Sequence, residues 1–222
     1  MVEVHTIRRN LRLVGFALIT LAALATVSQA ELYTYGFTRI EPHNASENIA
    51  AQLFVDVTNE GVLAGQTLFV FRNVGLVEST IKKVLFDDGA LLGIAELRQD
   101  GTTVSFTEPA SNEVLPEGEH LSPPFETTEG FSALAEPPPA TWGVDPGEQL
   151  GIVFDLKESK TYLDVLASLA SGDLRIGLHV ISIGSNAESD AFVNDGVVPL
   201  PGAVLLGMLG MGAAGWRLRR FA

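Results

Sequence analysis

Residues 174–180 of this chain are Leu-Arg-Ile-Gly-Leu-His-Val, and they show its clearest secondary-structure pattern. Apolar Leu174, Ile176, Leu178 and Val180 alternate with Arg175, Gly177 and His179. Because successive side chains of a strand point to opposite faces, this period of two predicts a β-strand with one face in a core. The segment therefore favours a sheet over a helical bundle.

The same alternation recurs along the middle of the chain. It predicts further strands over residues 33–40, 52–58, 81–86, 103–106 and 150–156, and residues 68–72, apolar on both faces, predict a central strand. Turn-forming sequences separate these segments, namely Asn59-Glu-Gly61, Asp87-Asp-Gly89, Asp100-Gly101 and Asp145-Pro-Gly147. The Asp100-Gly101 pair lies between two strand-like runs and predicts a hairpin. Many short strands joined by polar turns favour an antiparallel β-sandwich.

One short α-helix is expected among the strands, over residues 161–171. Its apolar residues Tyr162, Val165, Leu166 and Leu169 follow helical spacing, with Thr161 as the N-cap and Gly172 as the stop. Residues 109–142 are rich in Pro and Glu and predict a long loop over the sandwich, anchored by Phe125, Phe131 and Leu134. The expected fold is mainly β, an antiparallel β-sandwich with one short α-helix.

Charge and composition exclude several functions. The chain has 222 residues, no cysteine and a net charge of −13. Residues 31–197 hold 26 acidic and eight basic side chains, a net charge of −18. A body this acidic repels phosphate backbones, so no nucleic-acid partner is expected. The absence of cysteine rules out thiolate nucleophiles and thiolate metal sites.

Residues 1–30 have the pattern of a signal peptide. Three arginines, the last of them Arg12, precede an apolar run over 13–27, and small residues stand at Ser28 and Ala30. Cleavage is expected between Ala30 and Glu31. The alternative, a retained anchor helix, requires about 20 apolar residues, more than this run offers. The protein is therefore expected to be exported.

Residues 198–222 combine three features in order. Val198-Pro199-Leu200-Pro201 leads into an apolar segment that ends at Trp216, and Arg217, Arg219 and Arg220 follow. From Leu200 to Trp216 is about 17 residues, which as a transmembrane helix would span roughly 26 Å. A basic cluster after such a helix favours a cytoplasmic C-terminus, which leaves the acidic body outside. The chain is thus predicted to have three parts: signal peptide 1–30, domain 31–197 and C-terminal segment 198–222.

The C-terminal order resembles the PEP-CTERM sorting signal in its Val-Pro-Leu-Pro variant. This resemblance implies an exosortase-type processing enzyme as partner, transient insertion in the inner membrane, and delivery to the cell surface or matrix of a Gram-negative bacterium. Leu200 and Gly202 stand where that family usually has Glu and Ala. The body also resembles a domain recurrent in such proteins, through Phe71-Arg-Asn-Val-Gly and residues 172–180. That second likeness implies a fold and a location and no chemistry.

Candidate catalytic and metal-binding groups are few. His43 and His120 are expected in solvent, and His179 is expected to be a structural histidine or to line a polar groove. Asp87-Asp88 is a possible carboxylate pair for glycoside chemistry, although a turn is the simpler interpretation. The polar stretch 186–195 offers weak calcium ligands, Glu188, Asp190 and Asp195, in an expected exposed loop that lacks EF-hand spacing. No catalytic residue and no cofactor other than this possible calcium are predicted.

These observations predict a structural or adhesive protein of exopolysaccharide and biofilm, not an enzyme. Two alternatives remain open at this stage. One is an exported polysaccharide-modifying enzyme that uses carboxylates, and the other is a membrane-tethered periplasmic protein that keeps its C-terminal segment.

Overall fold

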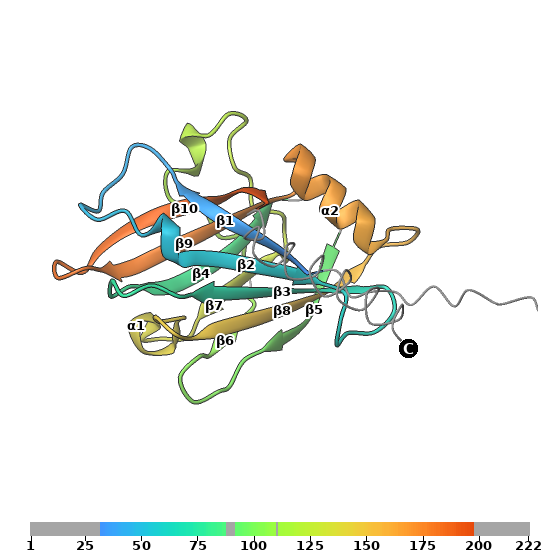
Figure 1. The fold of residues 1–222 in the computed structure, drawn as a ribbon, viewed down its shortest axis with the longest axis horizontal. Coiled ribbons are helices and arrows are strands. Elements are labelled where there is room, and N and C mark those ends of the chain that lie inside the picture. Colours follow the sequence, from blue (N-terminus) through green and yellow to red (C-terminus); the bar gives the residue numbers. More distant parts are fainter. Residues whose placement is uncertain (1–31, 88–91, 110, 198–222) are drawn as a thin grey trace, which may run out of the picture.

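Antiparallel strands dominate the computed structural model, which describes residues 32–87, 92–109 and 111–197 (Figure 1). Its ten strands are β1 (Tyr33–Arg39), β2 (Leu53–Thr58), β3 (Gln66–Asn73), β4 (Thr80–Asp87), β5 (Leu92–Arg98), β6 (Phe106–Thr107), β7 (Ser132–Ala135), β8 (Gln149–Leu156), β9 (Arg175–Ile183) and β10 (Glu188–Val197). Its helices are α1 (Pro139–Trp142), α2 (Tyr162–Ser171) and the 3₁₀ turns η1 (Ala50–Gln52) and η2 (Gly118–His120). The expected mainly β, antiparallel class is confirmed.

The strands form one sheet in the order β5-β8-β3-β2-β1-β10-β9-β4-β7-β6. This sheet curls into a barrel-like shape, because strands distant in the order contact each other across the core. Four strands stand between β3 and β4 in this order. The ring centroids of Phe69 on β3 and Phe86 on β4 are nevertheless only 5.4 Å apart. The two apolar faces that pack together therefore belong to one continuous sheet.

A side chain closes the gap between the two edge strands. Gln99 follows β5, and its Oε1 accepts the backbone N–H of Phe106 on β6 at 2.5 Å. Its Nε2 donates to the carbonyl of Phe106 at 3.2 Å, so the amide acts as a strand backbone would. The predicted hairpin at Asp100-Gly101 is wrong, since β5 pairs with β8 and β6 pairs with β7. The turn itself exists, with Asp100 accepting three backbone N–H groups, which lower the pKa of its carboxyl group.

Gln99→Ala is expected to lower the free energy of unfolding by about 1–3 kcal/mol, because it leaves the N–H and carbonyl of buried Phe106 without partners. Urea unfolding measures this loss. The matched control is Gln66→Ala, which removes exposed hydrogen bonds to Asp155 and to the backbone N–H of Leu63 and should change stability by less than about 0.5 kcal/mol, because water can replace both partners. Equal effects of the two substitutions would contradict a closing role for Gln99.

Helix α2 confirms the predicted helix and lies across one end of the barrel (Figure 1). Thr161 and Asp164 form a capping box, and Gly172 ends the helix at φ +81°, a conformation that glycine adopts without strain. Tyr162, Val165 and Leu169 are buried, whereas Leu166 is only partly buried. The Tyr162 hydroxyl donates to the carbonyl of Val57 at 2.9 Å and ties α2 to the end of β2.

Three predictions about the remaining segments need correction. Residues 109–142 are not one loop, since they contain η2, β7 and α1. Of the expected anchors, Phe125 and Phe131 are buried and Leu134 is partly exposed on β7. Residues 103–106 contribute only Phe106 to a strand. The stretch 186–195 is mostly β10 and not an exposed loop.

The predicted terminal segments lie outside the described residues. These are the signal peptide with its cleavage point at Ala30 and Glu31, and the C-terminal segment from Val198 to Arg220. Within the part of the chain that the structure describes, no helix is long and apolar enough to cross a bilayer.

Candidate functional site

The outer face of β9 is covered by a long surface segment, residues 111–128. Leu115 and Phe125 from this segment form a second apolar cluster with Leu85 and with residues of β10 and the end of β1. Gly177 on β9 lies directly beneath them: a Cβ there would come within 2.6 Å of Leu115 Cδ2 and 3.1 Å of Phe125 Cζ. The non-core face of the 174–180 strand therefore contacts protein instead of solvent.

Arg175, on the same face, holds this surface segment in place. Its guanidinium forms an ion pair with Asp87 and donates to the carbonyls of Pro123 and Pro124 at 2.6 and 2.5 Å. It also lies 5.4 Å from the ring centroid of Phe125. Asp87 accepts the backbone N–H of Glu126 at 3.1 Å. The carboxylate considered for glycoside chemistry is thus engaged in structure, and its neighbour Asp88 lies outside the described residues.

His179 is partly buried, beside Lys82 and Lys83. Burial lowers its pKa to about 4, and the nearby positive charges of Lys82 and Lys83 act in the same direction. Its Nδ1 is buried without a hydrogen-bond partner. His179 lies on the non-core face of β9, as expected. Among the described residues, however, its Nδ1 lacks the hydrogen-bond partner expected of a structural histidine.

The pKa of His179 predicts how stability changes with acid. In the unfolded chain a histidine titrates near pH 6.5, so between about pH 6.5 and 4 the unfolded state binds the proton more readily than the folded state. Stability should fall as pH falls through this window, by up to about 3 kcal/mol at pH 4 from this residue. His179→Gln should flatten that part of the curve of unfolding free energy against pH. His43→Gln, at a half-exposed site, is the control. If His179→Gln has the same dependence of unfolding free energy on pH as the wild type, His179 is not the source of the acid sensitivity.

The three calcium candidates do not form one site. Glu188 accepts the N–H and the hydroxyl of Ser46, each at 2.7 Å, and these hydrogen bonds lower the pKa of its carboxyl group. Buried Asp190 accepts the N–H of Asn44 at 2.6 Å and is ion-paired with Arg39. These two carboxylates hold residues 44–46 against the barrel.

Asp195 lies further along β10 and belongs to a different environment. Its Oδ2 accepts the hydroxyl of Thr38 at 3.2 Å, and its side chain is exposed. The extended backbone of β10 therefore separates Asp195 from Glu188 and Asp190, although all three lie within eight positions of the sequence.

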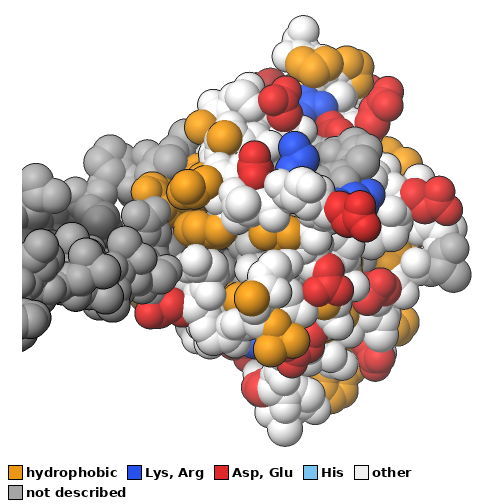
Figure 2. All heavy atoms as spheres, turned by 90° about the vertical axis from the view of Figure 1, so that its right-hand side faces the viewer, with side chains coloured by type: hydrophobic (Ala, Val, Ile, Leu, Met, Phe, Trp, Pro, Cys, Tyr) orange, Lys and Arg blue, Asp and Glu red, His pale blue; other side chains and the backbone are white. Residues whose placement is uncertain are grey.

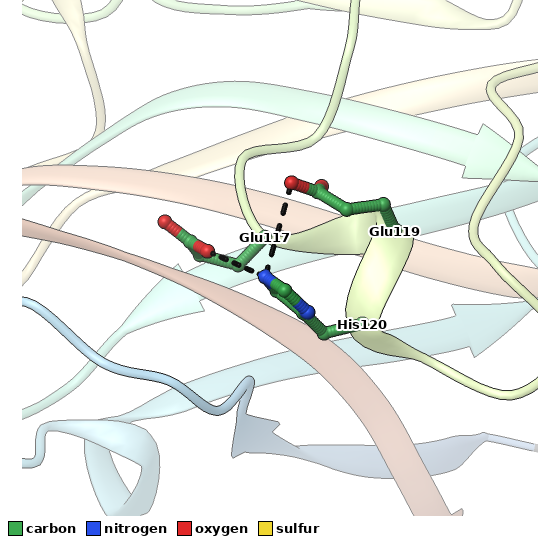
Figure 3. Close-up of side chains that lie close together, drawn as sticks. All are labelled: Glu117, Glu119 and His120. Carbon is green, nitrogen blue, oxygen red and sulfur yellow. Dashed lines mark ion pairs between the residues drawn. The ribbon is translucent and has the colours of Figure 1, made fainter.

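A cluster that the sequence analysis missed lies in η2. Figure 3 shows Glu117, Glu119 and His120 converging, with one potential ligand atom from each within 4.8 Å of the others. His120 Nε2 is 3.3 Å from Glu117 Oε2 and 3.9 Å from Glu119 Oε1. Carboxylates and imidazole are the ligand types that a divalent ion such as zinc accepts. The pattern Glu-Gly-Glu-His was a possible indication, but these side chains are largely exposed, as expected for His120, and no metal is assigned to them.

Two open grooves carry polar side chains. One, of about 840 Å³, lies between the end of β5 with its following turn and the start of β8, and includes Glu96, Gln99, Glu148 and Gln149. The other, of about 570 Å³, lies beside the C-terminal end of α2 and includes Arg175, Asn194 and Asp195. Carboxylate, amide and guanidinium groups form hydrogen bonds with hydroxyl groups, so both grooves suit a hydroxyl-rich ligand. Nothing in the local sequence pattern predicts either groove, because each combines distant segments.

These features define an acidic, barrel-like antiparallel β domain with two surface segments held by charged side chains. No family model, curated protein or solved structure matches the chain. Its function is therefore inferred from its own residues.

Proposed function

We propose that this chain is an exported protein of a Gram-negative bacterium, sorted to the cell surface or extracellular matrix through residues 198–222. Residues 1–30 direct its export, and an exosortase-type enzyme processes the C-terminal segment after transient insertion in the inner membrane. The domain between them has a structural or adhesive role in extracellular polysaccharide and is not an enzyme.

The observation that carries this proposal is where the domain begins and ends. Strand β1 starts at Tyr33, two residues after the predicted cleavage point, and β10 ends at Val197, immediately before the proline motif. Tyr35 and Val197 are paired on adjacent antiparallel strands, so both chain ends leave from one end of the barrel (Figure 1). Two terminal segments that enter the same membrane, with the domain on one side of it, fit such an arrangement.

The described side chains favour binding over catalysis. A hydrolase needs a nucleophile within hydrogen-bond reach of a base. Of the described histidines, His43 and His120 are exposed and contact glutamates, and partly buried His179 lies beside Lys82 and Lys83, whose charges lower its pKa. The grooves, by contrast, offer hydrogen-bonding groups to sugar hydroxyls.

Intact-mass analysis of the native protein tests the sorting proposal. The expected product starts at Glu31, ends between Val198 and Pro201, and is recovered outside the cell. A membrane-bound form that keeps Arg217–Arg220 would instead identify a tethered periplasmic protein.

Sedimentation with extracellular polysaccharide from the same cells tests adhesion, with the mature protein taken from the medium. We expect binding that Asp195→Ala weakens, because this substitution removes a carboxylate of the smaller groove. Glu108→Ala, at an exposed site that lines neither groove, is the control. Absence of wild-type binding both with and without calcium would refute the adhesive role.

A further inference from the structure

Three leucines are exposed at the end of the barrel that carries the chain ends. Leu32 is 56% exposed, Leu63 73% and Leu163 65%. Exposed apolar side chains that occur singly are ordinary, but a group of them at one end of an acidic domain indicates a contact surface.

Strand register places these leucines at the same end. Leu32 directly precedes β1, whose first residue Tyr33 is paired with Val57 near the end of β2. Leu63 lies in the connection that follows β2. Leu163 is on α2, next to Tyr162, which binds the carbonyl of Val57.

Two lysines are exposed at this end as well. Lys157 and Lys160 lie between β8 and α2, and the end of β8 is tied to the start of β3 by the Asp155–Gln66 pair. They are two of the four lysines in the chain; Asp155 and Glu158 are near them in sequence, and Lys157 Nζ lies 5.7 Å from the ring centroid of Phe131. Figure 2 views the molecule from this end and shows hydrophobic side chains exposed among acidic ones and a few basic ones. Leucine next to lysine is the composition of surfaces that lie in the headgroup region of a bilayer.

The length of the connecting chain identifies what this surface contacts. No more than the four residues Val198–Pro201 separate the end of β10 from the apolar segment, and four extended residues reach at most about 14 Å. Once that segment is inserted, this end of the barrel cannot move further than that from the headgroups. We infer that the surface formed by Leu32, Leu63, Leu163, Lys157 and Lys160 rests on the lipid headgroups of the membrane while the C-terminal segment is inserted. This inference depends on the proposed function, because it requires the inserted segment.

Site-specific fluorescence quenching in vesicles tests the orientation. The chain has no cysteine, so Leu63→Cys and Leu163→Cys each supply one labelling site for a polarity-sensitive fluorophore. The full chain is reconstituted in phosphatidylcholine vesicles, since the charge of −18 would be repelled by anionic lipid. A nitroxide on the lipid headgroup is the quencher, and far-UV circular dichroism checks that each variant is folded.

Leu76→Cys is the matched control. Leu76 is fully exposed and follows β3, whose last residue Asn73 is paired with the first residue of β2, at the opposite end of the barrel. We expect quenching at positions 63 and 163 to be several-fold stronger than at 76.

Equal quenching at all three positions, in protein that floats with the vesicles, would overturn the inference and leave the proposed sorting intact. Protection of positions 63 and 163 that rises with protein concentration, without lipid quenching, would assign the surface to a second copy and also overturn it. Failure of the wild-type chain to float with vesicles would refute membrane insertion, and the proposed function and the inference would then fall together.

Discussion

Replacing Phe86 by alanine is expected to lower the free energy of unfolding by about 3–5 kcal/mol. Phe86 is fully buried on β4, and its ring centroid lies 5.4, 6.1 and 4.6 Å from those of Phe69, Phe71 and Phe154. These three rings belong to β3 and β8, on the opposite side of the core. Phe86 therefore joins the two sides of the curled sheet, and its loss removes both buried area and edge-to-face ring contacts.

Denaturant unfolding followed by circular dichroism measures this effect. Phe86→Leu keeps most of the apolar volume and should be clearly less destabilising, while Leu76→Ala at a fully exposed site should change stability by less than about 0.5 kcal/mol. A loss below about 1 kcal/mol for Phe86→Ala would show that the two sides of the barrel do not depend on this contact.

Replacing Asp190 by alanine should cost about 3 kcal/mol, because it breaks a buried ion pair from one side. The side chain of Asp190 is 1% exposed, and that of its partner Arg39 is 12% exposed, with Nη1 of Arg39 3.8 Å from Oδ2 of Asp190. Among the described residues, the substitution leaves the Arg39 guanidinium with the carbonyl of Ala45 and the largely exposed carboxylate of Glu41, at 3.7 Å. It also removes the acceptor for the N–H of Asn44, so residues 41–47 should become more accessible to proteases.

Asp195→Ala is the matched control, since the sequence offered both aspartates as ligands of one calcium ion. Because Asp195 is exposed and bonded only to the Thr38 hydroxyl among the interactions resolved for it, its removal should change stability little. Unfolding of both variants is measured with calcium and with a chelator. A calcium-dependent stabilisation that both substitutions abolish equally would restore the shared calcium site and contradict the structural role of Asp190.

The predicted elements that proved correct are those with a complete local pattern. The strand over 174–180, the strand over 150–156 and the helix after Thr161 each bury one regular set of apolar residues, so period and capping residues suffice to identify them. Strand β10 was missed because its polar residues hold surface segments by hydrogen bonds, and its pattern is therefore that of a turn. Strand β7 was missed because Ser132–Ala135 is too short to show a period.

The candidate site was less predictable than the fold. The sequence identified Arg175 and His179 as the non-core side of a strand but could not show that Leu115 and Phe125 cover Gly177 between them. It also placed Asp87 in a turn, but it could not show that Asp87 pairs with Arg175, 88 residues later.

The sequence by itself determined the class of fold, the length of the domain, its acidic charge and the predicted terminal signals, because periodicity, composition and short motifs are local properties. Only the tertiary structure decided that Gln99 closes the barrel and that both chain ends leave together. It alone joined Glu188 to Ser46 and Asp190 to Asn44, 142 and 146 residues apart. The physical reason is that a polar side chain takes its role from the partner it meets in the fold, and no pattern along the chain specifies which of many equivalent acidic residues will meet which donor.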